Sequence, residues 1–154
     1  MFEKSTNHLE ETLTSGKVSL DEYWKENASD MLPAGDAFSS YFRETLKRHG
    51  KAQNDTFVCA DIPERYGYKL VSGEKKTRKR DLILRLCLAG GFSLEETNRA
   101  LKMYGFSPLY ARDRRDAVII TCINTNHCAP DYVDELLQHY RQLPLASCGT
   151  LEDE

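Results

Sequence analysis

The sequence contains no apolar run that approaches the roughly 20 residues a membrane-spanning helix needs. Its first sixteen residues, MFEKSTNHLEETLTSG, are polar and acidic, unlike the apolar centre of a secretory signal. The five cysteines are odd in number and irregularly spaced, which argues against a disulfide framework. We therefore expect a cytoplasmic protein with no membrane partner.

Motifs of the common enzyme classes are also absent. The sequence has no GxSxG, P-loop, GxGxxG or HExxH pattern, and its four histidines are dispersed. The segment CINTNHC places His127 beside Cys128, six residues after Cys122, whereas zinc sites usually show tighter pairs such as CxxC. Cys59 and Cys87 lie in apolar surroundings in the sequence, where a free cysteine acts as a small hydrophobe. We expect no enzyme activity, no metal and no cofactor.

Positive charge is scarce except in the middle of the chain. Residues 47–80 carry ten basic and four acidic groups, although the whole chain has a net charge of −3. The segments 1–46 and 117–154 each have a net charge of −5. A basic centre between acidic ends indicates an anionic partner for the centre, or a solvated basic loop.

Apolar residues recur at helical spacing in most segments, and no segment reads convincingly as a strand. Ser19 with Glu22, and Ser93 with Glu96, form the capping-box pattern that begins a helix. The segment VIITCI at 118–123 fits a buried strand or a buried helix, and we predict helix because no partner strand is evident. The fold class is therefore all-α, a compact multi-helix bundle of about seven to eight helices.

Glycines, prolines and shifts in composition divide the chain into four predicted parts. These are an N-terminal helical arm at 1–37, a helix-turn-helix domain at 38–106, a C-terminal helical extension at 107–145 and an acidic tail at 146–154. The helix-turn-helix follows from two short helices, Gln53–Asp61 and Pro63–Gly73, with almost nothing between them. In that motif the second helix lies in the DNA major groove.

The order of elements extends this pattern. The helix that ends in "SG", the basic link "EKKTRKRD" and the leucine-rich helix at 82–88 together resemble the five-helix DNA-binding domain of the XRE family, the phage-repressor-like regulators. The resemblance covers about residues 38–125, and the segment SPLYARDRRDAVIITCIN resembles an extension on a subset of bacterial members. It implies an all-α regulator of transcription that binds double-stranded DNA without a cofactor.

Two sets of contacting residues follow from the resemblance. Arg matches the two acceptors of guanine, and Glu can accept from cytosine, so the start of the second helix would read bases. Lysines and arginines of the link would contact phosphates, which position the protein without specifying sequence. The base-contact candidates are Glu64, Arg65, Tyr66, Tyr68 and Lys69. The phosphate-contact candidates are Gln53, Lys75, Lys76, Arg78 and Lys79.

Three positions depart from the family. Phe57 stands where the family usually has a small residue, Asp61 where it has glycine, and Gly67 where it has a branched apolar residue. The exchange of bulk between Phe57 and Gly67 roughly conserves volume, which cores tolerate. Phe57, Gly67, the groove-facing position of Glu64 and the acidic flanks support an alternative function, a protein-interaction adaptor that keeps the fold without DNA binding.

Other roles remain open at this stage. Tyr66 and Tyr68 could be half-buried core residues, and Arg112, Arg114 and Arg115 could form ion pairs with Asp113, Asp116 or the acidic tail, or a second basic patch. Helix-turn-helix proteins commonly dimerise on palindromic sites. A homodimer is therefore one expected partner, through the Tyr23–Trp24 stripe or the C-terminal helix, and a protein bound by the acidic arms is another.

Overall fold

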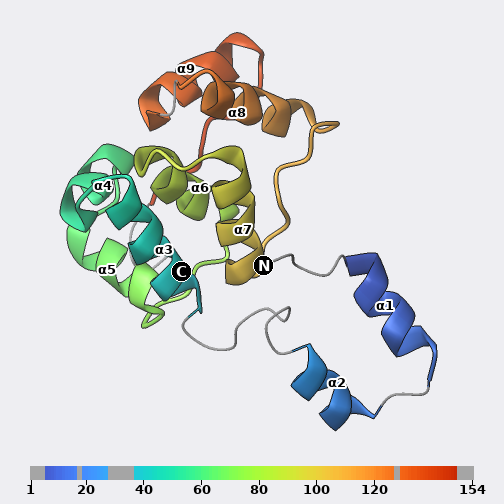
Figure 1. The fold of residues 1–154 in the computed structure, drawn as a ribbon. Coiled ribbons are helices and arrows are strands. Elements are labelled where there is room, and N and C mark those ends of the chain that lie inside the picture. The colour runs from blue at the N-terminus through green and yellow to red at the C-terminus, as the bar shows by residue number, and fades with distance from the viewer. Residues whose placement is uncertain (1–5, 17–18, 28–36, 127–128, 149–154) are drawn as a thin grey trace. The chain divides into compact units, whose positions relative to one another are not determined.

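The computed structural model describes residues 6–16, 19–27, 37–126 and 129–148 (Figure 1). These residues form nine α-helices and no strand, which confirms the all-α prediction with a count slightly above the expected one. The helices are α1 (Thr6–Thr14), α2 (Leu20–Glu26), α3 (Ala37–Arg48), α4 (Gln53–Ala60), α5 (Glu64–Ser72), α6 (Arg80–Ala89), α7 (Leu94–Tyr104), α8 (Arg114–Asn124) and α9 (Pro130–His139). None of them is long and apolar enough to cross a membrane.

The chain forms two units, one from Met1 to Ala34 and one from Gly35 to Glu154. The first unit contains α1 and α2. The hydroxyl of Ser19 accepts a hydrogen bond from the backbone N–H of Glu22, so α2 begins where the capping pattern predicted. Helical spacing predicts an apolar stripe of Leu20, Tyr23, Trp24 and Met31 here; Tyr23 is buried, whereas Leu20 and Trp24 are exposed. Met31 lies outside the described residues, and so does Asp36, which the sequence predicts as the cap of the following helix.

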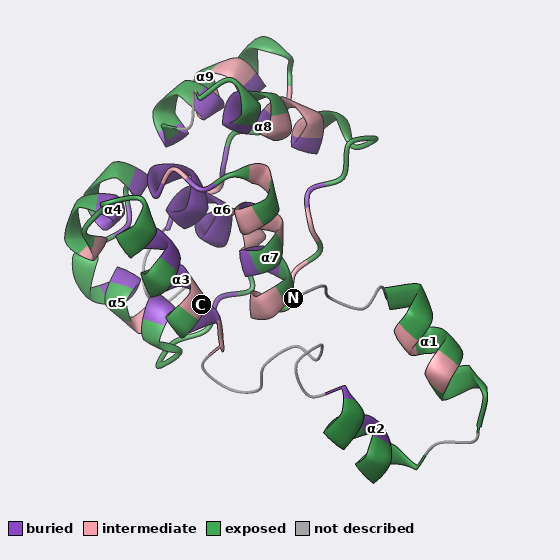
Figure 2. Ribbon diagram, viewed as in Figure 1, coloured by how far each residue is buried: buried purple, intermediate pink, exposed green. Residues whose placement is uncertain are grey.

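Helix α6 is the centre of the second unit. Every residue from Leu82 to Ala89 is buried, and α4, α7 and α9 pack against this helix. Figure 2 shows α6 as the most completely buried helix of the unit. The apolar run of this helix therefore reflects burial on all sides.

The sequence signals for helix ends are confirmed in this unit. Ser93 and Glu96 form both hydrogen bonds of a capping box at the start of α7. Gly73 and Gly105 follow α5 and α7 in the left-handed conformation, which a residue with a side chain adopts less readily. The segment 118–123 lies within α8, so its prediction as helix is confirmed.

The C-terminal part folds as one unit with the predicted helix-turn-helix domain. Helices α8 and α9 pack together, and α9 also contacts α6. Residues 143–148, which we call the C-terminal strap, return along α6 and bury Leu145 and Cys148. The predicted acidic tail begins at 146, but residues 146–148 belong to the strap, where Arg85 of α6 donates to the carbonyl of Ala146 and the N–H of Ala146 donates to Asp81 of α6. Residues 149–154 lie outside the described residues.

Candidate nucleic-acid interface

The turn between α4 and α5 consists of Asp61, Ile62 and Pro63. Asp61 adopts the left-handed conformation, with φ 57° and ψ 46°, at the position where the resemblance led us to expect glycine. The N–H of Ile62 then donates to the carbonyl of Phe57 at 3.0 Å, and the Ile62 side chain is buried. Asp61 thus adopts the left-handed backbone conformation that glycine adopts more easily. The turn thereby fixes the direction of α5.

The sequence predicts Pro63 in the first turn of α5. In the structure, Pro63 is instead the residue just before that helix. Its φ of −53° and ψ of 133° are extended, and its carbonyl accepts the first helical hydrogen bond, from the N–H of Gly67 at 2.8 Å. Because proline has no N–H, none is left unpaired at this position.

Phe57 and Gly67 face each other across the α4–α5 contact. Phe57 is completely buried, and a β-carbon built on Gly67 would lie 2.6 Å from the Phe57 ring. That distance is far below van der Waals contact, so only glycine fits beneath this ring. The two residues between which the sequence indicated an exchange of bulk are therefore in direct contact in the structure.

The exposed face of α5 contains most of the predicted base-contact residues. Glu64 and Arg65 are exposed in the first turn, Tyr68 is 40% exposed one turn later, and Lys69 is half-buried. The ring of Tyr68 packs edge-on against Phe57 at 4.9 Å between centroids, so the core fixes its position. This face presents side chains suited to base edges on a rigid helix.

Tyr66 requires a correction. It is only 2% exposed and belongs to the hydrophobic core, so it does not reach a surface partner. The helical period explains this, because Tyr66 shares the inner face of α5 with Leu70. The alternative prediction, a half-buried core residue, places Tyr66 on the correct face but understates its burial.

The predicted phosphate-contact residues lie at two places. Gln53 is the first residue of α4 and is half-buried. The others belong to the link between α5 and α6, residues 73–79, which we call the cationic link. Lys75, Lys76 and Arg78 are exposed there. Lys79 is half-buried, and its ammonium lies 3.5 Å from the carbonyl of Cys148 in the strap, so it is the least available of the four cations.

The cationic link has a defined backbone course. The N–H of Lys75 donates to the carbonyl of Lys69 at 3.1 Å, which closes the end of α5. The N–H of Thr77 donates to the hydroxyl of Tyr104 in α7 at 2.9 Å, and the hydroxyl of Thr77 accepts from the N–H of Lys79 at 3.0 Å. Three exposed cations are therefore presented from a backbone that hydrogen bonds hold on both sides.

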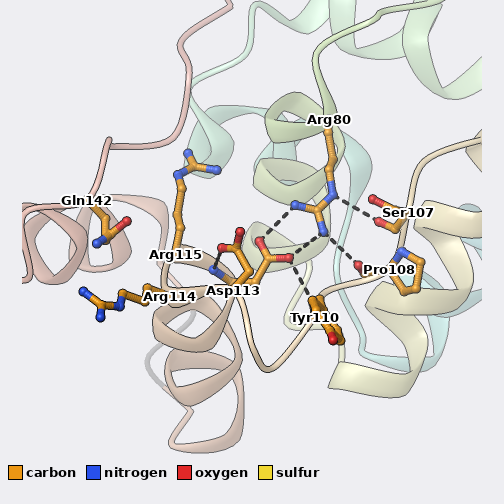
Figure 3. Close-up of a pocket in the computed structure, with 9 residues that line it drawn as sticks. Arg80, Ser107, Pro108, Tyr110, Asp113, Arg114, Arg115 and Gln142 are labelled. Carbon is orange, nitrogen blue, oxygen red and sulfur yellow. Dashed lines mark hydrogen bonds and ion pairs between the residues drawn. The ribbon is translucent and has the colours of Figure 1, made fainter.

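Two ion pairs join α6 to α8 crosswise, and sequence reasoning missed them. Arg80 forms a two-pronged pair with Asp116 at 3.0 and 3.1 Å, and the following residue, Asp81, forms one with Arg115 at 2.8 and 2.9 Å. Figure 3 shows the guanidinium of Arg80, which also donates to the carbonyls of Ser107 and Pro108 in the α7–α8 connection. Among the residues that the structure describes, the ion-pair partner of Arg115 is thus Asp81, whereas the sequence had suggested Asp113, Asp116 or the tail.

The Asp81–Arg115 pair also holds the strap. Arg115 donates to the carbonyls of Leu143 and Pro144, and Asp81 accepts from the N–H of Ala146. Burial alone would raise the pKa of Asp81, but the hydrogen bonds from Arg115 and Ala146 hold that pKa below its ordinary value. The hydrogen bond to Asp81 likewise raises the pKa of Arg115. Both groups are therefore charged near neutral pH.

Arg85 links the strap to the helix-turn-helix. It is 5% exposed, and its guanidinium donates to the carbonyls of Leu145 and Ala146 at 2.9 and 2.8 Å and to the carbonyl of Ala60 at 3.3 Å. Ala60 is the last residue of α4, directly before the turn. The charge of Arg85 is compensated by these carbonyl dipoles and by Asp134 at 3.5 Å.

The cysteine predictions have mixed outcomes. Cys87 is buried in the core as expected, and burial raises the pKa of its thiol. Cys59 is exposed, so its apolar neighbours in the sequence do not surround it in the structure. Cys122 is buried, and His127 and Cys128 of the same segment lie outside the described residues. Within the described ranges, no three His, Cys, Asp or Glu side chains gather in a way that could hold a metal ion.

Comparison of the chain with protein-family models, with curated proteins and with solved structures finds no match. Conclusions about function therefore depend on the geometry of α4, α5 and the cationic link.

Proposed function

We propose that this chain binds double-stranded DNA as an XRE-like helix-turn-helix protein, with α5 in the major groove. The observation that carries the proposal is the arrangement of α4, the Asp61 turn and α5. The turn fixes α5 with Arg65 and Tyr68 exposed on one face, and a cationic link follows at once. This combination offers base-reading side chains and phosphate contacts on consecutive elements.

Each exposed residue has a role that its chemistry supports. Arg65 donates two hydrogen bonds to a guanine, and Glu64 accepts from a cytosine amino group. Lys75, Lys76 and Arg78 neutralise phosphates. Tyr68, supported by the Phe57 ring, contacts a thymine methyl group or a sugar.

The biological role that follows is sequence-specific regulation of transcription in the cytoplasm of a bacterium. A helix-turn-helix protein reads two half-sites when it dimerises, with the half-sites one helical turn apart. A homodimer on a palindromic site is therefore part of the proposal.

Selection of bound sequences from a random duplex library tests the proposal. The full chain is expected to enrich a short motif that contains a guanine contacted by Arg65, and titration on that motif should be tighter than on a scrambled duplex. The control is the variant Arg65→Ala, which should lose the enrichment at that base. A wild-type protein that enriches no motif would contradict sequence-specific binding.

A specific observation supports a second candidate, a protein-interaction adaptor. The surface of α4 and the turn presents Val58, which is 79% exposed, between the acidic residues Asp55 and Asp61. An apolar side chain flanked by carboxylates suits a protein partner better than phosphates, because carboxylates repel an anionic backbone. Under this function Val58→Glu would abolish capture of the protein partner, whereas Lys75 and Lys76 could be neutralised without effect.

A further inference from the structure

We propose that Tyr104, a residue of α7 outside the α4–α5 motif, positions the cationic link for its phosphate contacts. The inference rests on the proposed DNA binding. Its basis is the hydrogen bond from the N–H of Thr77 to the Tyr104 hydroxyl, at 2.9 Å. This bond joins the middle of the link to the last residue of α7, which is 27 positions later in the chain than Thr77.

The hydroxyl of Tyr104 has a fixed place because its ring is held on two sides. The ring of Phe38 in α3 packs edge-on against it at 4.9 Å, and the ring of Phe106 stacks on it at 5.3 Å with an interplanar angle of 15°. Aromatic pairs in these arrangements resist displacement. Tyr104 therefore acts as a rigid acceptor set by two elements, α3 and the connection after α7.

At Thr77 the cationic link points toward the protein interior. It is 5% exposed, whereas its neighbours Lys76 and Arg78 are exposed. A buried N–H that loses its acceptor costs about as much as a lost hydrogen bond, so the bond to the Tyr104 hydroxyl stabilises Thr77 in its buried position. With Thr77 inside, the two flanking cations are directed outward.

Tyr104 also contacts one of these cations directly. The ammonium of Lys76 lies 5.5 Å from the centre of the Tyr104 ring, within the range of a cation–π interaction. The ring thus restricts the Lys76 side chain while leaving it exposed. Ordering a flexible cation before it meets phosphate lowers the cost of ordering on binding, which raises affinity.

The test compares wild type with Tyr104→Phe, which removes only the hydroxyl and keeps the ring against Phe38 and Phe106. Loss of one hydrogen bond should weaken binding to a 20-base-pair duplex by about two- to tenfold. The slope of log affinity against log salt should also become shallower, because fewer phosphates are neutralised. The matched control is Tyr140→Phe, on an exposed tyrosine after α9, which should change neither quantity.

A double-mutant cycle separates positioning from general loss of stability. Lys76→Gln should shallow the salt slope by about 0.9 in wild type and by clearly less in the Tyr104→Phe background. Equal effects of Lys76→Gln in both backgrounds would overturn the inference while leaving DNA binding intact. Absence of salt-sensitive duplex binding by the wild type would instead overturn the proposed function, and the inference with it.

A measurement without DNA checks the geometry itself. In the wild-type chain, the amide of Thr77 should exchange its hydrogen much more slowly than the exposed amide of Lys76, and Tyr104→Phe should remove that protection. Rapid exchange at Thr77 in wild type would contradict the hydrogen bond on which the inference depends.

Discussion

The ring of Phe57 fills the space above Gly67 that a β-carbon would need, with a closest approach of 2.6 Å to that position. The two residues belong to the two helices of the proposed helix-turn-helix, α4 and α5. This contact therefore sets the distance between the helix that would cross the DNA backbone and the helix that would enter the groove.

Phe57→Ala should lower the free energy of unfolding by about 3–5 kcal/mol, because it leaves a cavity in a completely buried site. The double variant Phe57→Ala with Gly67→Ile should recover part of this loss by filling the cavity from the other helix. Chemical denaturation of the two variants measures both effects.

Two controls accompany this pair. Val58→Ala, at the exposed neighbour of Phe57, should change stability by less than about 0.5 kcal/mol. Gly67→Ala alone should destabilise, although alanine is the better helix former, because its β-carbon would overlap the Phe57 ring. A stabilising Gly67→Ala would show that the two helices do not approach as described.

Much of this motif could be predicted from the sequence. The positions of α4 and α5 follow from local spacing, whereas the exposed face with Arg65 and the exchange of bulk between Phe57 and Gly67 were implied by the resemblance to a known family. Tyr66 was assigned to the wrong face because the prediction treated the whole first turn of α5 as exposed, whereas the helical period turns Tyr66 inward.

The attachment of the C-terminal part could not be predicted in the same way. Its crosswise pairs join two Arg-Asp dipeptides, 80–81 and 115–116, that are far apart in the chain. No local pattern determines which distant carboxylate an arginine meets, because that depends on tertiary packing. The course of the strap at 143–148 could not be predicted either. Its sequence has no helical periodicity, and hydrogen bonds with the distant residues Arg85 and Asp81 hold it in place.

Neutralisation of the cationic link tests its assignment to phosphates. Replacing Lys75 and Lys76 together by Gln should shallow the log–log salt slope of duplex binding by about 2, at roughly 0.9 per phosphate contact. Arg141→Gln, at an exposed arginine beyond α9, is the matched control and should leave the slope unchanged. An unchanged slope in the double variant would exclude these lysines as phosphate contacts.

Protonation of Asp81 at low pH should weaken the attachment of the strap to α6. Because folding lowers the pKa of this carboxyl, its contribution to stability is present above the ordinary value of 3.8 and disappears as the pH falls through the lower value of the folded state. Asp81→Asn should therefore be less stable than wild type at pH 7, and the difference should shrink below about pH 4.

Denaturation at several pH values measures this difference, and Glu44→Gln, at an exposed residue of α3, serves as the control. A stability difference between Asp81→Asn and wild type that stays constant from pH 7 to strongly acidic solution would contradict the role given to the Arg115 pair.

The most direct test of the proposed DNA binding is the titration of wild type and Arg65→Ala against a selected site and a scrambled duplex. Arg65 is exposed in the first turn of α5, where a base contact would form. The variant should lose about 1–3 kcal/mol of binding free energy on the selected site and much less on the scrambled duplex, because a base contact specifies whereas phosphate contacts only position. Equal losses on both duplexes, or no loss on either, would contradict the assignment of α5 as the reading helix.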